Sequence, residues 1–297
     1  MTTIRIAVLC LSVAACTPGG RDARGEAELA GRERRVAERL AEARGTPAAA
    51  DEPIARWDLP AGLREVSGLA LTADGRLLAH GDEQARIYEI DYRRGVVVKT
   101  FDVGATPLTG DFEAIAVAGT RIFLVTSDAA IYEFTEGADG ERVPFRMVRT
   151  DVPGCQEIES ATYDPDAAAL VLACKTPAKG AGDAIRVYEW PVGGGAPARQ
   201  RLAVPLEALA ARGFDGKRFS ASDIARRPDN GNFVLVAGPE HGYAEITPRG
   251  GVVVARVLSK RHPQPEGVTV TADGLLLVAD EGAKGDGSLT VYPAPLR

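Results

Sequence analysis

Acidic side chains recur at one position of a repeated pattern in this chain of 297 residues. Five units of short apolar runs can be aligned, at spacings of 46, 46, 63 and 44 residues, on Ser67, Glu113, Glu159, Ser222 and Glu266. Carboxylates that converge on one site repel one another, and removing them from water is costly. A bound Ca²⁺ or Mg²⁺ ion, which prefers oxygen ligands, would relieve both costs. Protonation, or hydrogen bonds from backbone amides of neighbouring units, is the alternative.

We therefore expect a divalent cation, Ca²⁺ first, and the expected ligands are Glu65, Glu113, Glu159, Asp223 and Glu266. Glu65 precedes Ser67 by two residues, so both side chains lie on one face of an extended strand. Asp223 stands one residue out of register. Further polar residues follow the second strand of their units, and these ligand-pocket candidates are Asp82, Glu83, Lys175, Asp280 and Glu281. Lys175 is the cation among them, suited to neutralising the carboxylates or to binding an anionic group.

Catalytic residues cannot be assigned from motifs. The sequence has no G-x-S-x-G, H-E-x-x-H or P-loop pattern, and its three histidines are His80, His241 and His262. The net charge is −6, with no long run of lysines or arginines in the globular part, which argues against a nucleic-acid partner.

The elements that would position these residues are short strands separated by Gly, Asp and Pro turns. Units of 40 to 50 residues are typical of four-stranded propeller blades. We predict an all-β propeller over residues 53–297 with five blades, or six if the long interval hides another. The same interval holds an amphipathic stretch, 204–213, expected to form a surface helix. The segment Ile54–Leu59 is expected to pair with Leu289–Tyr292 and so close the ring.

Two cysteines lie in the folded part. Cys155 and Cys174 stand on either side of the turn at Asp164, so an antiparallel hairpin would bring them opposite each other. An exported protein permits their oxidation, and a disulfide is predicted.

The N-terminus predicts export. Residues 1–15 resemble a signal peptide, with an apolar stretch too short to span a bilayer. The V-A-A-C sequence ending at Cys16 resembles the bacterial lipobox, whose cysteine carries the lipid anchor. We expect a lipoprotein of the cell envelope, facing the periplasm from the outer membrane in a diderm host. Residues 16–52 are expected to form a flexible or partly helical spacer, with a thin apolar stripe of Leu29, Val36 and Leu40.

Five short phrases of the repeats resemble the SdiA-regulated, YjiK-like family of bacterial β-propellers. They are E-V-S-G-L from Glu65, D-F-E-A-I from Asp111, E-I-E-S-A from Glu157, F-S-A-S-D-I from Phe219 and Q-P-E-G-V from Gln264. The resemblance implies a propeller related to the phytase-like and NHL-type superfamily, with calcium as an expected ion. It brings no settled activity.

Three functions are compatible with this pattern. The preferred hypothesis is an envelope module that binds a divalent cation and a small ligand at the central channel. The alternative is a metal-dependent hydrolase of phytase-like or lactonase-like type. A phosphoesterase would need cations near the carboxylates, for which the sequence offers Lys175, Arg226 and Arg227. The third hypothesis is a structural or interaction protein. The ligand, the protein partners and the oligomeric state are not predicted.

Overall fold

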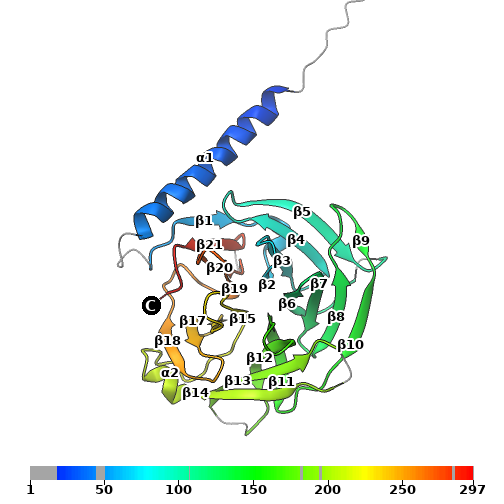
Figure 1. Ribbon diagram of the computed structural model, residues 1–297, viewed down its shortest axis with the longest axis vertical. Coiled ribbons are helices and arrows are strands. Elements are labelled where there is room, and N and C mark those ends of the chain that lie inside the picture. Colours follow the sequence, from blue (N-terminus) through cyan, green and yellow to red (C-terminus); the bar gives the residue numbers. More distant parts are fainter. Residues whose placement is uncertain are drawn as a thin grey trace, which may run out of the picture.

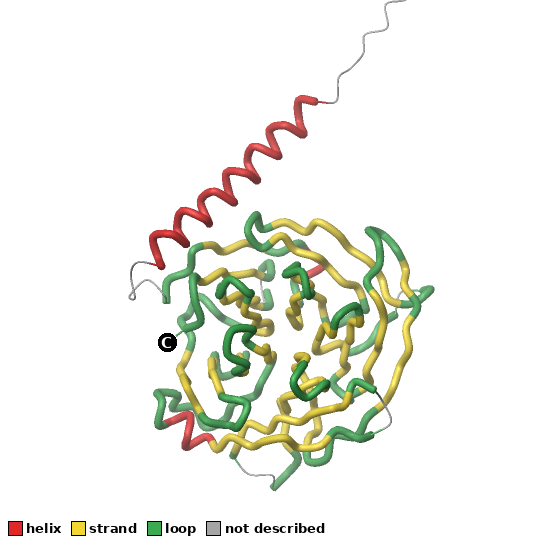
Figure 2. Tube along the Cα trace, viewed as in Figure 1, coloured by secondary structure: helices red, strands yellow, loops and turns green. Residues whose placement is uncertain are grey.

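The computed structural model describes residues 19–44, 51–106, 108–180, 183–193, 196–282 and 285–296. Five sheets surround a common axis, with their inner strands toward the centre (Figure 1, Figure 2). The predicted five-bladed β-propeller is confirmed. The signal peptide and Cys16 lie outside the described residues.

Each blade is an antiparallel sheet that runs from an inner to an outer strand. Blade 1 comprises β2 (Val66–Leu71), β3 (Leu77–Gly81), β4 (Arg86–Asp91) and β5 (Val96–Val103). Blade 2 comprises β6 (Phe112–Ala118), β7 (Arg121–Thr126), β8 (Ala130–Thr135) and β10 (Phe145–Arg149). Blade 3 comprises β11 (Cys155–Asp164), β12 (Ala169–Pro177), β13 (Ala184–Pro191) and β14 (Arg199–Pro205). Blade 4 comprises β15 (Asp223–Arg226), β16 (Phe233–Ala237), β17 (Gly242–Ile246) and β18 (Val252–Val257). Blade 5 comprises β19 (Pro265–Val270), β20 (Leu276–Asp280), β21 (Ser288–Tyr292) and β1 (Ala55–Asp58).

Blade 5 closes the ring, because its outer strand comes from the start of the domain. Strand β1 pairs antiparallel with β21, from Ala55 opposite Val291 to Asp58 opposite Ser288. The pairing predicted between the two ends of the domain is therefore confirmed. Two short helices accompany the blades: η2 (Ala61–Leu63) precedes β2, and α2 (Leu206–Ala210) lies within the stretch expected to be helical.

The turn between the first two strands of a blade explains the Asp-Gly signals of the repeat. In blade 1 the Thr72 hydroxyl donates to Asp74 at 2.5 Å and accepts the Arg76 amide at 3.0 Å. The Gly75 backbone between them has a φ of +83°, a region that favours glycine. In blade 5 Thr271 forms the same pair of hydrogen bonds with the residues that follow it. The Thr-x-Asp-Gly sequence thus specifies a turn.

The core is divided among the junctions between blades. Five clusters of buried apolar side chains each join two neighbouring blades in the described residues. Alternate residues of each strand face opposite neighbours, so the strands are apolar on both faces. This arrangement stacks the blades around the axis and leaves the ends of the inner strands for polar residues.

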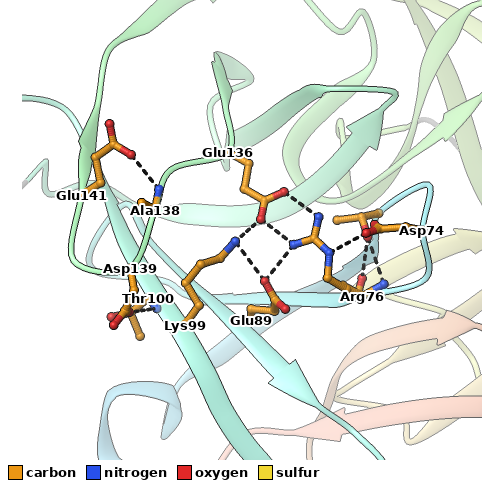
Figure 3. Close-up of polar contacts among 10 residues, drawn as sticks. Asp74, Arg76, Glu89, Lys99, Thr100, Glu136, Ala138, Asp139 and Glu141 are labelled. Carbon is orange, nitrogen blue, oxygen red and sulfur yellow. Dashed lines mark hydrogen bonds and ion pairs between the residues drawn. The ribbon is translucent and has the colours of Figure 1, made fainter.

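Blades 1 and 2 are joined by two additional features. The short strand β9 (Arg142–Val143) leaves blade 2 and pairs in parallel with the outer strand of blade 1. Figure 3 shows an ion-pair network in which Arg76 of blade 1 binds Glu89 and Glu136. Lys99 binds the same two carboxylates. The hydrogen bond from Arg76 holds the pKa of Glu136 down at about 2, despite partial burial. These contacts are structural and lie away from the predicted metal ligands.

Residues Gly19–Arg44 form the helix α1, which extends away from the ring beside β1 (Figure 1). Val36 and Leu40 are 2% and 7% exposed, and they pack with Ile54 in the cluster between blades 5 and 1. Arg39 donates to the Ile54 carbonyl at 3.0 Å, so polar contacts accompany the apolar ones. The C-terminal half of α1 therefore rests on the strand that closes the propeller. None of the helices in the described part of the chain is long and apolar enough to cross a membrane.

Candidate functional site

The inner strands bring the aligned polar residues to one end of the central channel, which we call the channel mouth. Ser67 and Glu113 come from blades 1 and 2, and the Ser67 hydroxyl donates to Oε2 of Glu113 at 3.4 Å. Glu159 comes from blade 3, while Ser222 and Glu266 come from blades 4 and 5. One repeated register, applied by five sheets around an axis, produces this convergence.

Lys175 is the cation of the channel mouth. It lies on β12, and its Nζ forms an ion pair with Glu159 of the neighbouring strand β11. Burial works against the charge of Lys175. The hydrogen bond and charge of Glu159 prevail, with support from Glu266 and Glu113, and they raise the pKa of Lys175. Lys175 thus interacts electrostatically with all three glutamates, and we call these four residues the Glu–Lys cluster.

The glutamates of the cluster bind protons more tightly than free carboxylates do. Burial, followed by the charge of Glu159, raises the pKa of Glu113 to about 8. Burial also raises the pKa of Glu266 to about 7, against the opposing effects of Lys175 and Ser222. The pKa of Glu159 is raised by burial as well, although its ion pair with Lys175 opposes this. Two carboxyl groups therefore change protonation near neutral pH.

A glycine makes room for one of these carboxylates. A Cβ placed on Gly238 would collide with Oε1 of Glu266, and Ser222 Oγ would lie 3.2 Å from it. The Gly238 amide also donates to Ser222 Oγ at 2.9 Å. A hydrogen bond links Ser222 to Glu266 in turn. The loop after β16 thus fixes the Glu266 carboxylate in place.

Asp223 lies deeper in the channel than the Glu–Lys cluster. It stands one residue further along its inner strand than Ser222, the aligned residue of blade 4. It is fully buried, and Oδ2 accepts the amides of Val268 at 2.7 Å and Leu69 at 3.4 Å. Oδ1 accepts the Ile224 amide at 2.8 Å. Burial raises the pKa of Asp223 well above its ordinary value, even though the three amides lower it. Asp223 therefore links blades 4, 5 and 1, and its oxygens already have partners.

Glu65 belongs to a second acidic group, at the rim of the channel mouth. It is exposed on the turn before β2, beside a pocket of about 270 Å³ that Asp82 and Glu83 also line. Burial and the charge of Glu65 raise the pKa of Asp82. Burial, Glu65 and Asp82 raise the pKa of Glu281. These residues lie on blades 5 and 1, and Glu281 connects them electrostatically to Glu266 and Lys175 of the Glu–Lys cluster.

Asp280 points into the protein instead of into a ligand pocket. It is 1% exposed, and its Oδ2 lies 2.8 Å from Nδ1 of His262. Nε2 of His262 lies 2.7 Å from the Tyr292 hydroxyl. The position of Asp280 after the second strand predicted accessibility, but the side chain faces a buried histidine from the preceding loop.

The predicted disulfide is confirmed and lies next to the Glu–Lys cluster. Cys155 and Cys174 are bonded, with their Cα atoms 5.8 Å apart. The bond joins β11 to β12 where bulges interrupt their register, between Cys155 and Ser160. Glu159 and Lys175 stand on these two strands, so the disulfide secures the hairpin that carries their ion pair.

The carboxylate oxygens at the channel mouth already have a positively charged partner, the side chain of Lys175. Within the described ranges, no group of three or more His, Cys, Asp or Glu side chains is arranged to hold a metal ion. The Nζ of Lys175 supplies the positive charge that the sequence had led us to assign to Ca²⁺. The donor set therefore does not fit a divalent cation as long as Lys175 is charged, and calcium binding stays a prediction.

Sequence reasoning missed two further cations near Lys175. Lys217 and Arg218 line a pocket of about 260 Å³ together with Lys175. They lie in the irregular segment between α2 and β15, outside the repeated pattern, so no register pointed to them. Arg226 and Arg227, the arginines that the sequence suggested, form ion pairs with Asp164 and Glu245 respectively.

Fold and site together define a five-bladed propeller with a glutamate–lysine cluster at its channel mouth. A family model described as "Phytase-like: Esterase-like activity of phytase" matches residues 61–244, more than half of the chain. The chain belongs to this phytase-like family. No curated protein matches the sequence significantly.

Several solved structures resemble this one at low sequence identity. Glutaminyl cyclase from Myxococcus xanthus superposes with a TM-score of 0.54 at 16% identity, covering 81% of this chain and 95% of that chain. The PQQ-bound aldose sugar dehydrogenase from Streptomyces coelicolor gives 0.48 at 14% identity, covering 80% and 98%. Virginiamycin B lyase from Staphylococcus aureus gives 0.44 at 14% identity, covering 80% and 69%. The first of these likenesses shows a shared fold and does not extend to activity.

Proposed function

We propose that this protein hydrolyses an ester at the channel mouth, with Glu266 as general base and Glu113 as general acid. The observation that carries the proposal is the Glu–Lys cluster itself. Glu266 and Glu113, with pKa values of about 7 and about 8, both interact electrostatically with Lys175. Carboxyl groups that titrate near neutral pH can serve as general acid and general base. The family description, which refers to esterase-like activity of phytase, supports ester hydrolysis as the class of reaction.

The proposed reaction needs one water molecule and no added oxidant or reductant. Glu266, ionised above pH 7, accepts a proton from the water whose oxygen attacks the ester centre. Lys175 stabilises the negative charge that develops on the oxygen of that centre. Glu113, protonated below pH 8, donates its proton to the leaving oxygen as the ester bond breaks. Glu159 holds Lys175 in place through its ion pair.

The test is turnover of chromogenic esters by the full chain. We expect hydrolysis of p-nitrophenyl acetate or p-nitrophenyl phosphate, with a bell-shaped profile whose limbs lie near pH 7 and 8. Glu266→Gln and Glu113→Gln should each lower kcat by about 10² or more, because general acid or base catalysis contributes that much. Glu38→Gln is the control, since Glu38 is an exposed acid on α1, outside the channel mouth. Absence of turnover, or turnover that survives both substitutions, would refute the proposal.

Metal dependence separates this proposal from the metal-dependent hydrolase that the sequence suggested. The same assay is run with EDTA and with added Ca²⁺. Turnover unaffected by EDTA supports the Glu–Lys cluster as the whole catalytic apparatus. Turnover lost with EDTA and restored by Ca²⁺ would favour the alternative, in which the carboxylates hold a cation. Tight Ca²⁺ binding without turnover would favour the cation-binding module.

We also propose that the protein acts at the cell envelope, anchored through a lipid on Cys16, and that it is a YjiK-like member of the family. The support is the lipobox-like sequence and the five repeat phrases. Metabolic labelling with palmitate tests the anchor. The native chain should be labelled and found in the membrane fraction, whereas Cys16→Ser should be neither.

A further inference from the structure

A pocket with three cations opens beside the Glu–Lys cluster, between blades 3 and 4. Lys175 forms its inner side, and Lys217 and Arg218 lie on the wall formed by the segment before β15. The volume is about 260 Å³, room for a small charged group. Asp183 also lines the pocket and is the one carboxylate among the described residues that line it. Lys175 already has Glu159 as its ion-pair partner. Lys217 and Arg218, set against Asp183, give the rest of the lining a positive balance in a protein whose total charge is −6.

The charges of Lys217 and Arg218 are not taken up by ion pairs among the described residues. Both are exposed, and neither forms an ion pair with a carboxylate in the described part of the chain. Arginines elsewhere on the propeller behave differently: Arg76, Arg201 and Arg227, for example, each bind two or more carboxylates. The two cations of the pocket therefore have their hydrogen-bond donors available for a ligand.

The backbone that carries these cations is held in place. Phe219, the residue after Arg218, is 6% exposed and packs edge-on against Phe214, with ring centroids 5.4 Å apart. The next residue, Ser220, donates its amide and its hydroxyl to the two oxygens of Glu240, at 2.8 and 3.0 Å. A buried aromatic ring and a two-point hydrogen bond thus fix the segment just after the cations. Preorganisation of this kind lowers the entropy lost when a ligand binds.

We infer that this pocket binds an oxyanion group of the ligand, a phosphate or a carboxylate. Arg218 supplies a planar fork of donors that suits two oxygens of one anion, and Lys217 supplies a point charge. Lys175 lines the pocket and also belongs to the Glu–Lys cluster, so an anion bound here lies next to the proposed acid and base. The inference rests on the proposed function: if the protein hydrolyses an ester, an anion pocket at this place means that the ester carries a negatively charged group.

The test measures anion binding without turnover. Isothermal titration calorimetry of the full chain with inorganic phosphate and with acetate, at constant ionic strength, should show saturable binding of at least one anion. The double variant Lys217→Gln, Arg218→Gln should weaken it by about tenfold or more, because charge-assisted hydrogen bonds are lost. The control is Arg249→Gln, Lys260→Gln, which removes two exposed charges elsewhere and should change affinity less than about twofold.

Each outcome decides the inference. Tighter binding of phosphate assigns a phosphoester, and tighter binding of acetate assigns a carboxylate; both support the pocket. Absence of saturable binding, or equal weakening in the two double variants, overturns it. If the first double variant melts early, Arg218→Gln alone replaces it. Anion binding to the native chain together with failure to hydrolyse any ester would refute the proposed function and leave the pocket standing.

Discussion

Replacing Glu113 by glutamine should stabilise the protein at high pH and should not do so at low pH. Glutamine resembles the protonated form of the side chain, which the folded state prefers. The pKa of Glu113 rises from an ordinary 4.5 to about 8 on folding, because burial and the charge of Glu159 disfavour the ionised form. The folded chain therefore binds a proton that the unfolded chain has released, between pH 4.5 and pH 8. Stability from this group is complete below pH 4.5 and is lost as the pH rises through 8.

The size of the effect follows from the shift. One pKa unit corresponds to about 1.4 kcal/mol, so the full shift would correspond to about 5 kcal/mol. Glu113 keeps some contact with solvent, and the positive charge of Lys175 favours its ionised form. We therefore discount the value to about 2 kcal/mol. For a domain of this size that amounts to roughly 4–8 °C in Tm.

The measurement is the unfolding free energy of the native chain and Glu113→Gln, by urea titration at pH 5 and pH 9. The quantity of interest is the change in the difference between the two proteins, because contributions from lost or gained contacts cancel. Glu38→Gln serves as control, since Glu38 is exposed on α1 and away from the channel mouth. A difference between native and Glu113→Gln that stays constant from pH 5 to pH 9 would show that the buried carboxyl is not protonated near neutrality. The acid–base assignment would then lose its basis.

Three further outcomes are expected. Reducing the Cys155–Cys174 bond should cost about 3 kcal/mol, the chain entropy of a loop with a separation of 19 residues; an unchanged urea midpoint in dithiothreitol would contradict this. Asp223→Ala should destabilise the fold by about 3–5 kcal/mol, because it leaves buried amides of three blades without an acceptor; a loss below 1 kcal/mol would refute its role as a link. Ca²⁺ should leave the Tm of the native chain unchanged and raise that of Lys175→Gln, since removing the lysine frees the carboxylates; stabilisation of both proteins alike would instead support the original cation prediction.

The five-bladed architecture could be predicted from the sequence, because the spacing of the repeated units gives the number and length of the blades. Each inner strand begins at the same register position, and the blades convert that register into a ring, so the repeat spacing is enough to group Glu113, Glu159 and Glu266. Closure by the first strand follows from the need to pair an edge. The added strand β9 carried no comparable signal, because it is two residues long and pairs in parallel with another blade.

The details of the site could not be predicted, because they depend on contacts between units. Whether Glu159 faced a metal or a lysine was decided by the position of Lys175 across the hairpin. Asp280 shares a register with accessible residues but meets His262, which comes from outside the repeat. Lys217 and Arg218 stand in an irregular segment, where spacing carries no information about spatial position.

The pairing of β1 with β21 also orders events during folding. The first strand of the propeller finds its partner only when Ser288–Tyr292, at the other end of the domain, has been made. Until then β1 is an open edge, and β21 is one as well from its synthesis until the two strands pair; open edges can pair with other chains. Contacts of such long sequence separation form slowly. A chain delivered across a membrane in an extended state would complete this step after translocation, and a chain cut shortly before β21 would remain an open, aggregation-prone arc of sheets.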